Sequence, residues 1–293
     1  MKIQKNLSSK IFQDIVFSNV SKKILLKYEN IPQEVLKKIN KMVYDAAMYY
    51  LPFDYVNFEI ISIEEEVFRE VPDTIIDRAF MDLILKVKPQ AEKPYTEYEG
   101  KLMICDWKTT SSDFDTRWRQ RYIESWQWKR YACFNNAALF EFRGVSTKTN
   151  WDGESKLSHS CHPLIIAVPE DNEENVDKQI KAIQSAKIAL QNFIIWPRNM
   201  PEACNKFEAC DYINDCANVT MPLVQLTLPE KTSYSSDNTF MLCNEKYRRL
   251  KLDENITKAV NYDSASIIGD LFHIGIQEIY KQAKELQENG IEY

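Results

Sequence analysis

The chain has 293 residues, of which 44% are hydrophobic and 27% charged, and this ordinary globular composition excludes a disordered protein. Its length admits one elaborated domain or two small ones, and its formal net charge of −6 does not by itself indicate a nucleic-acid partner, since such binding depends on local patches. Because the sequence has no long apolar run and no basic-then-apolar leader, we expect a cytoplasmic protein without a membrane partner, and its Asn-, Lys- and Ile-rich composition is typical of an AT-rich genome, such as that of a phage.

The expected elements alternate between strand and helix along the chain. β-Branched and aromatic residues predict strands, and apolar residues at helical spacing predict helices. The expected helices are 32–50, 114–140, 174–195 and 265–288. The expected strands are 55–70, 79–87, 101–107 and 163–168, whereas the Pro- and Cys-rich residues 197–231 are expected to be irregular. This order predicts an α/β fold in which helices flank a central mixed β-sheet.

Acidic residues near the ends of two expected strands are the first candidate site. Residues two apart on a strand point to the same face, so Asp106 and Lys108 should project together while Trp107 turns away. Asp82 lies on the neighbouring strand in apolar surroundings, where a carboxylate is costly unless it is paired or binds a cation. Two such carboxylates predict a site for Mg²⁺ or Mn²⁺, which can polarise a phosphodiester and activate a water. The alternative is that Asp106 and Lys108 form an ordinary surface pair.

A basic and aromatic segment follows this site at residues 116–131. At helical spacing Trp118, Tyr122 and Trp126 share a face that should pack inward, while Gln127 and Tyr131 align on another. Arginines reach phosphates and aromatic rings stack on bases, so the segment suits contact with DNA. The candidate nucleic-acid-binding residues are Arg117, Arg119, Arg121, Lys129 and Arg130. The alternative is a core helix with a solvated basic side.

These motifs together resemble the RecB-like branch of the PD-(D/E)XK nuclease superfamily. The resemblance rests on Asp82 in an apolar strand, on I-x-D-W-K-T-T around Asp106 and Lys108, and on Gln127 and Tyr131 in Q-x3-Y. Ala79 stands where the family usually has Gly, three residues before the first Asp. The resemblance implies a restriction-endonuclease-like core and a metal-dependent deoxyribonuclease, with exonuclease action on DNA ends or single strands. It implies metal ligation by Asp82, Asp106 and the carbonyl of Trp107, with Lys108, Gln127 and Tyr131 completing the catalytic set.

Three cysteines, Cys204, Cys210 and Cys216, are spaced by five residues each and resemble the tail of iron–sulfur members of the same branch. The segment that usually supplies the fourth cysteine resembles S-Y-S-S-D-N-T-F-M-L-C around Cys243, although Asn244 replaces the usual Pro and the next residue, Glu, replaces the usual Arg. Thiolates bind either zinc or an iron–sulfur cluster, and the absence of C-x2–4-C pairs favours [4Fe–4S] over Zn²⁺. The alternative is four thiols that bind no metal. The other three cysteines, Cys105, Cys133 and Cys161, are expected to be small buried side chains.

The order of these motifs suggests a circular permutation. Gly269 and His273 resemble the family's G-x3-H motif, whose His joins the metal site, although a histidine on a helix is by itself more often a core residue. We therefore expect residues 230–293 to correspond to the family's beginning and to pack with residues 1–229. The alternative is that they complete the site of a second subunit.

Two other classes of function remain open from the sequence. One is a non-catalytic nucleic-acid-binding module that retains a nuclease fold, and the other is a zinc-stabilised interaction protein. The presence of Asp82, Asp106 and Lys108 together favours the enzyme.

Overall fold

The structure is a computed structural model that describes residues 18–24, 31–72, 75–111, 113–148, 160–191, 228–229, 231–248, 252 and 264–290. The strands are β1 (Phe58–Val71), β2 (Ile75–Val87), β3 (Leu102–Thr110), β4 (Leu139–Ser146), β5 (Cys161–Ala167) and β6 (Lys231–Ser233). The helices are α3 (Gln33–Asn57), η1 (Tyr95–Tyr98), α4 (Thr116–Ile123), α5 (Trp126–Ala132), α7 (Asn172–Leu190), α10 (Tyr234–Leu242), α11 (Asn244–Tyr247) and α12 (Ser264–Glu288). The fold is thus α/β, as the sequence predicts.

The chain divides into two compact units that interleave along the sequence. The first unit comprises Met1–Glu66, Phe80–Pro169 and Tyr262–Tyr293, and the second comprises Val67–Ala79 and Glu170–Asn261. The boundary predicted between residues 229 and 230 follows the order of the motifs along the chain, and it stays a prediction. The last helix, α12, belongs to the first unit together with β3 and α3.

The central sheet is mixed, as expected, with the strand order β1-β2-β3-β4-β5. Strand β3 pairs antiparallel with β2 and parallel with β4, and β5 returns antiparallel to β4. A parallel pair requires a crossover connection, and α4 and α5 supply it between β3 and β4. In the second unit, β6 pairs in parallel with the first residues of β2.

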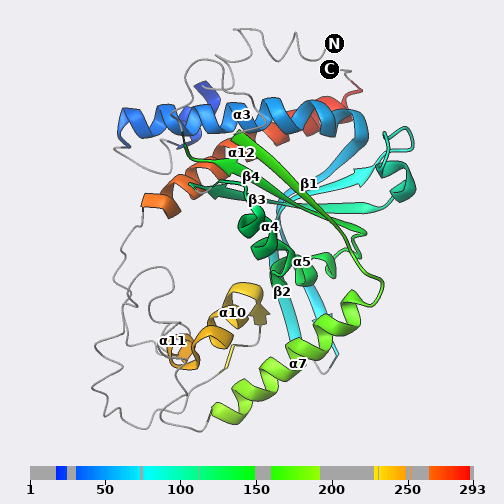
Figure 1. Ribbon diagram of the computed structural model, residues 1–293, viewed down its shortest axis with the longest axis vertical. Helices are drawn as coiled ribbons and strands as arrows, with labels where there is room; N and C mark the ends of the chain where they lie inside the picture. Colours follow the sequence, from blue (N-terminus) through cyan, green and yellow to red (C-terminus); the bar gives the residue numbers. More distant parts are fainter. Residues whose placement is uncertain are drawn as a thin grey trace. The chain divides into compact units, whose positions relative to one another are not determined.

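Helices α3 and α12 pack side by side on one face of the sheet (Figure 1). Trp107 of β3 points into this layer, where its ring contacts Tyr50 of α3 and both Phe272 and Tyr280 of α12. These four residues lie in or against the main apolar core, which also includes Cys105 and Cys161. Both cysteines are buried, as predicted.

A buried charge network lies at the centre of this core. Arg143 of β4 is 1% exposed and its guanidinium makes two hydrogen bonds, of 2.6 and 2.8 Å, to the carboxylate of Asp54. It also donates to Glu141 at 2.7 Å and to the hydroxyl of Tyr280 at 2.8 Å. The Tyr280 hydroxyl in turn donates to Asp54 at 2.5 Å. One arginine therefore joins α3, β4 and α12, and each of these buried charges has a charged partner.

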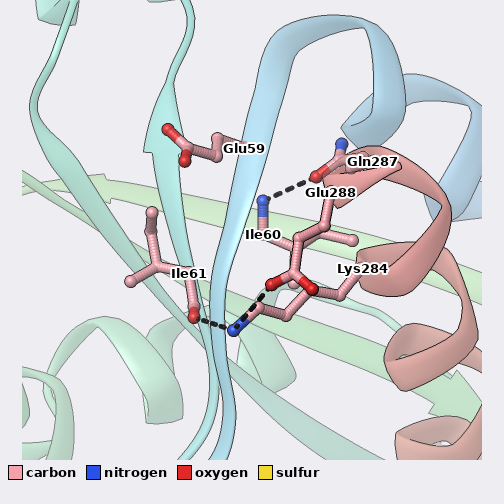
Figure 2. A pocket seen from close by; sticks show the side chains of 6 residues that line it. All are labelled: Glu59, Ile60, Ile61, Lys284, Gln287 and Glu288. Carbon is pink, nitrogen blue, oxygen red and sulfur yellow. Dashed lines mark hydrogen bonds and ion pairs between the residues drawn. The ribbon is translucent and has the colours of Figure 1, made fainter. Parts of the chain in front are cut away.

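The last turns of α12 cover the edge strand β1 (Figure 2). Gln287 donates to the carbonyl of Phe58 at 3.0 Å and accepts from the amide of Ile60 at 2.9 Å, and Lys284 donates to the carbonyl of Ile61 at 2.6 Å. These side chains occupy backbone groups that an edge strand would otherwise offer to another strand. The small pocket of about 230 Å³ beside them is part of this edge contact.

The expected helix over 114–140 is wrong, because the structure has two short helices there, followed by a strand. The first helix stops at Ile123, and the hydroxyl of Ser125 accepts from the amide of Gln127 and begins α5. Residues 139–146 form β4, in which every residue is buried. A strand buried on both faces lacks the alternation that distinguishes a strand from a helix in sequence. Trp126 therefore does not share a helix with Trp118.

The other predicted elements differ from the structure at their ends. Helix α3 continues to Asn57, so β1 begins three residues later than the expected strand, and β2 begins four residues earlier than expected. Most of the expected irregular segment 197–231 lies outside the described residues. In the described part of the chain, every helix is too short or too polar to cross a membrane.

Candidate metal centre

The site begins where strands β2 and β3 separate. Their paired register ends at Leu83 opposite Cys105, so Asp82 and Asp106 are the first residues beyond the paired segment on each strand. There the Asp82 Oδ2 accepts a hydrogen bond of 2.8 Å from the backbone amide of Trp107. A side-chain carboxylate thus takes the place of a backbone carbonyl, and the two acids come together at the opening between the strands.

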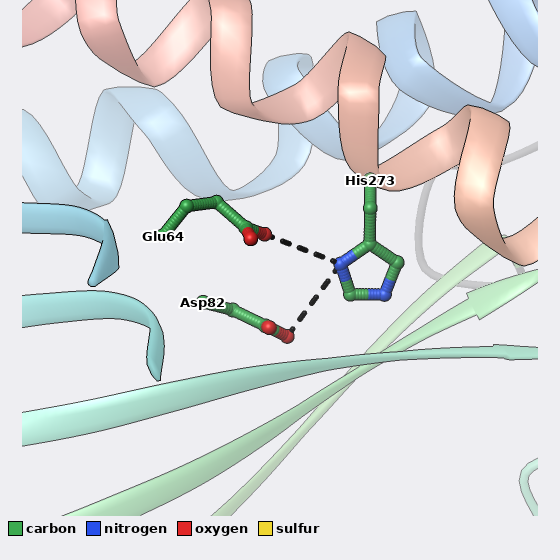
Figure 3. A group of neighbouring side chains, drawn as sticks. All are labelled: Glu64, Asp82 and His273. Atoms are coloured by element: carbon green, nitrogen blue, oxygen red, sulfur yellow. Dashed lines mark ion pairs between the residues drawn. The ribbon is translucent and has the colours of Figure 1, made fainter. Parts of the chain in front are cut away.

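Glu64, Asp82 and His273 come together from three different elements, β1, β2 and α12 (Figure 3). The Nδ1 atom of His273 lies 3.7 Å from Glu64 Oε1 and 3.7 Å from Asp82 Oδ2. One ligand atom from each of the three residues lies within 4.8 Å of the others. All three residues belong to the first unit.

Glu64 was not predicted from the sequence. It lies within β1 at a positive φ of 53°, a backbone conformation that is uncommon for residues other than glycine. Such a conformation inside a strand is strained and is found most often at functional sites. The only signal in the sequence is three consecutive glutamates inside an expected strand, which does not reveal that the first turns toward Asp82.

Asp106 and Lys108 form the second half of the site. Lys108 Nζ lies 2.5 Å from Asp106 Oδ2, and Gln127 of α5 donates to Asp106 Oδ1 at 2.7 Å. Tyr131 lies one turn after Gln127, and a hydrogen bond joins the two side chains. The predicted catalytic residues Asp82, Asp106, Lys108, Gln127 and Tyr131 therefore lie in one neighbourhood.

The ionisable groups of this site influence one another strongly. Burial and the neighbouring carboxylate of Asp106 raise the pKa of Asp82 to about 7. Burial by itself would lower the pKa of His273, but Glu64, Asp82 and Asp106 raise it above its usual value. Burial likewise opposes the charge on Lys108, but Asp106 and then Asp82 raise its pKa well above the usual range. Like charges so close together favour either bound protons or a bound cation.

The donor atoms fit a divalent cation. Carboxylates suit Mg²⁺ and Mn²⁺, whereas an imidazole suits transition metals, so the set of Glu64, Asp82 and His273 suits Mn²⁺ better than Mg²⁺. Asp106 Oδ2 is buried and has no hydrogen-bond partner among the described residues, apart from its ion pair with Lys108. Of the four expected ligands, Asp82 and His273 meet in this cluster, Asp106 is held by Gln127 and Lys108, and Trp107 contributes its backbone amide to Asp82.

The basic residues after the site do not all face solvent. Arg117, Arg119 and Arg121 of α4 are exposed, whereas Lys129 is half-buried. Arg130 is 4% exposed, which differs from the expected place on a solvated basic side. Arg119 lies 3.2 Å from the His162 ring, on β5. The exposed basic surface of α4 therefore consists of its three arginines.

The predicted iron–sulfur ligands lie largely outside the described residues, which include neither Cys204 nor Cys210 nor Cys216. Cys243 is buried in the second unit, directly after α10, and its carbonyl accepts from the amide of Tyr247 at 3.0 Å. Cys133 is buried, as predicted. A scan against known protein families and a search of curated proteins gave no match to the chain.

Proposed function

We propose that the chain is a metal-dependent nuclease that hydrolyses phosphodiester bonds of DNA. The observation that best supports this proposal is the convergence of Glu64, Asp82 and His273 beside the Asp106–Lys108 pair. These residues come from β1, β2, β3 and α12, and a surface salt bridge alone would not require acids from three strands and a histidine to meet. The mixed sheet, with its acids where β2 and β3 separate, agrees with a restriction-endonuclease-like core.

Each residue of the site has a distinct role in the proposed reaction. A divalent ion, when bound by Glu64, Asp82 and His273, would lower the pKa of a water and polarise the phosphodiester. Lys108 keeps its proton at neutral pH because its carboxylate neighbours raise its pKa. It therefore donates hydrogen bonds to the negative charge that develops on the phosphoryl oxygens, and it does not act as a general base.

Gln127 and Tyr131 hold the second acid in place. The amide of Gln127 fixes Asp106 Oδ1, which leaves Asp106 Oδ2 directed at Lys108. Burial and then Asp106 raise the pKa of Tyr131 above its usual range, so the phenol stays neutral and can hydrogen-bond with Gln127. We assign both residues to positioning, because the contacts described for them are to other protein side chains.

We further propose that one chain completes the site and that residues 230–293 correspond to the beginning of the RecB-like domain. The 3.7 Å separation of His273 Nδ1 and Asp82 Oδ2 within a single chain supports this proposal. We also propose a [4Fe–4S] cluster held by Cys204, Cys210, Cys216 and Cys243, on the sequence pattern described above. Exonuclease action on DNA ends or single strands remains part of the proposal.

A nuclease assay tests the proposed function. End-labelled linear DNA and closed circular DNA are incubated with Mg²⁺, Mn²⁺ or a chelator, and we expect metal-dependent degradation that begins at the labelled ends. Asp106→Ala and Lys108→Ala should each lower the rate roughly a hundredfold or more while DNA binding is retained. Asp113→Ala, at an exposed position before α4, is the control. Full activity of Asp106→Ala would end the nuclease proposal.

A further inference from the structure

An open pocket of about 350 Å³ lies between the end of β3 and helix α4. Its walls include Thr109, Thr110, Arg117, Trp118, Arg121 and Tyr122. Thr110 lies two residues after Lys108 on the same strand, so the two side chains share a face and are separated by about 7 Å along it. The pocket is thus the immediate continuation of the Lys108 site.

Positive charge dominates this pocket. Arg117 and Arg121 are one helical turn apart on α4, so their side chains are neighbours on the helix surface. The one acid in the wall, Asp115, already accepts a hydrogen bond of 2.9 Å from the amide of Trp118 as the N-cap of α4. The ion pair between Asp115 and Arg117 spans 3.9 Å, and the Arg117 side chain is 95% exposed, so this pair is weak. An anion that enters the pocket therefore breaks no strong interaction of Arg117.

Trp118 forms part of the pocket wall, and its indole Nε1 is buried with no acceptor in the described part of the chain. Trp118 itself is fixed against β4, since a Cβ at Gly144 would lie 2.9 Å from its ring. Only glycine at that position permits so close an approach.

We propose that this Arg117/Arg121 pocket binds the phosphate next to the scissile one on a single nucleic-acid strand. The inference rests on the proposed function for the location of the scissile phosphate. Two guanidinium groups and the hydroxyl of Thr110 match a phosphodiester, and the distance from Lys108 matches the repeat of phosphates along a strand. A volume of about 350 Å³ is large enough for one phosphodiester unit.

Cleavage of oligonucleotides that carry one neutral methylphosphonate tests the pocket. The neutral linkage is moved one position at a time along a single strand, and kcat/KM is measured with Mn²⁺ for the unaltered protein and for Arg117→Ala/Arg121→Ala. We expect one position beside the cleaved bond at which neutralisation lowers kcat/KM about tenfold in the unaltered protein and has no further effect in the double variant. Lys37→Ala is the control, because Lys37 is an exposed cation on α3 that does not line the pocket. It should retain the full tenfold effect.

If the methylphosphonate lowers kcat/KM equally in the unaltered protein and in the double variant, the pocket assignment is wrong, even if the protein is a nuclease. Binding supplies a readout that does not need activity. The salt dependence of binding to a fluorescent single strand should lose about one unit of log–log slope for each of Arg117→Ala and Arg121→Ala, and none for Lys37→Ala. Equal slopes in all three variants would likewise overturn it. An unaltered protein that shows these slopes but cleaves no nucleic acid with any metal would instead refute the proposed function.

Discussion

The carboxylate of Asp82 accepts the backbone amide of Trp107 at 2.8 Å, at the point where the β2–β3 ladder ends. This one hydrogen bond does two things. It directs Asp82 toward Asp106, and it ties the carboxylate to a strand whose next side chain, Trp107, is packed under α12. Trp107 therefore contacts both sides of the site. Its backbone amide holds Asp82, and its ring packs against α12, the helix that carries His273.

Glu64 should contribute directly to metal affinity. Replacement by Gln keeps the shape of the side chain and removes its charge, so we expect Mn²⁺ binding measured by calorimetry to weaken roughly tenfold or more. Glu65→Gln is the matched control, since Glu65 is the exposed neighbour on the same strand. If both variants bind Mn²⁺ as the unaltered protein does, Glu64 is not a ligand.

The stability of the metal-free protein should fall as pH rises. The pKa of Asp82 is about 7 in the folded protein, against an ordinary value near 4 in an unfolded chain. The folded state therefore holds its proton more tightly, and the stability that this proton contributes is complete below about pH 4 and is lost as pH rises through 7. The raised pKa of His273 acts in the same direction.

Thermal unfolding at pH 6 and pH 8 measures this effect. We expect a lower Tm at pH 8, a smaller difference in Asp82→Asn, and a larger increase on adding Mn²⁺ at pH 8 than at pH 6, because the ligands must be deprotonated to bind. A change of about 1 kcal/mol shifts the Tm of a chain of this size by roughly 2–4 °C, which is readily resolved. Asp113→Asn should retain the full pH dependence. A metal-induced shift that is the same at both pH values would contradict the prediction.

The buried network around Arg143 should dominate the stability of the first unit. Asp54→Ala leaves the guanidinium without its two-bond partner and should cost about 3–5 kcal/mol, whereas Tyr280→Phe removes one hydroxyl and should cost about 1–3 kcal/mol. Chemical denaturation provides both values. Glu174→Ala, which breaks an exposed pair with Lys178, should change stability by less than about 0.5 kcal/mol. Comparable costs for Asp54→Ala and Glu174→Ala would show that the network is energetically neutral.

Cys243 should determine whether the protein carries a cluster. Protein purified without oxygen is expected to be brown, and Cys243→Ser should remove the visible absorbance and lower stability, because cluster binding is coupled to folding. Cys133→Ser is the control, since Cys133 is also buried but lies in the first unit, after α5. Colourless protein with stoichiometric zinc would establish the zinc alternative, and protein with neither metal would leave four ordinary thiols.

The sequence predicted which residues of β2, β3 and α5 lie together better than it predicted the helices and strands themselves. Asp82, Asp106 and Lys108 could be placed together because strand geometry fixes which residues share a face, and Gln127 followed from its motif. Strand β4 was missed because its residues are buried on both faces and show no alternation. Glu64 was missed because its direction depends on a backbone turn with φ of 53°, which composition does not reveal. Arg130 was misplaced because the break at Ser125 starts a new helix with a different buried face.

The contact between Asp54 and Tyr280 joins positions 226 residues apart, and this separation sets an order of events during synthesis. Helix α3 and strand β3 leave the ribosome long before residues 264–288, so Trp107 has no α12 to cover it in the meantime. Contacts this distant in sequence slow folding and prolong the exposure of apolar surface. His273 arrives on the same late helix that closes the core. The first unit therefore closes its core in the same late step that brings His273 to Glu64 and Asp82, and a ribosome-bound chain that stops before residue 264 should have neither the closed core nor the proposed metal site.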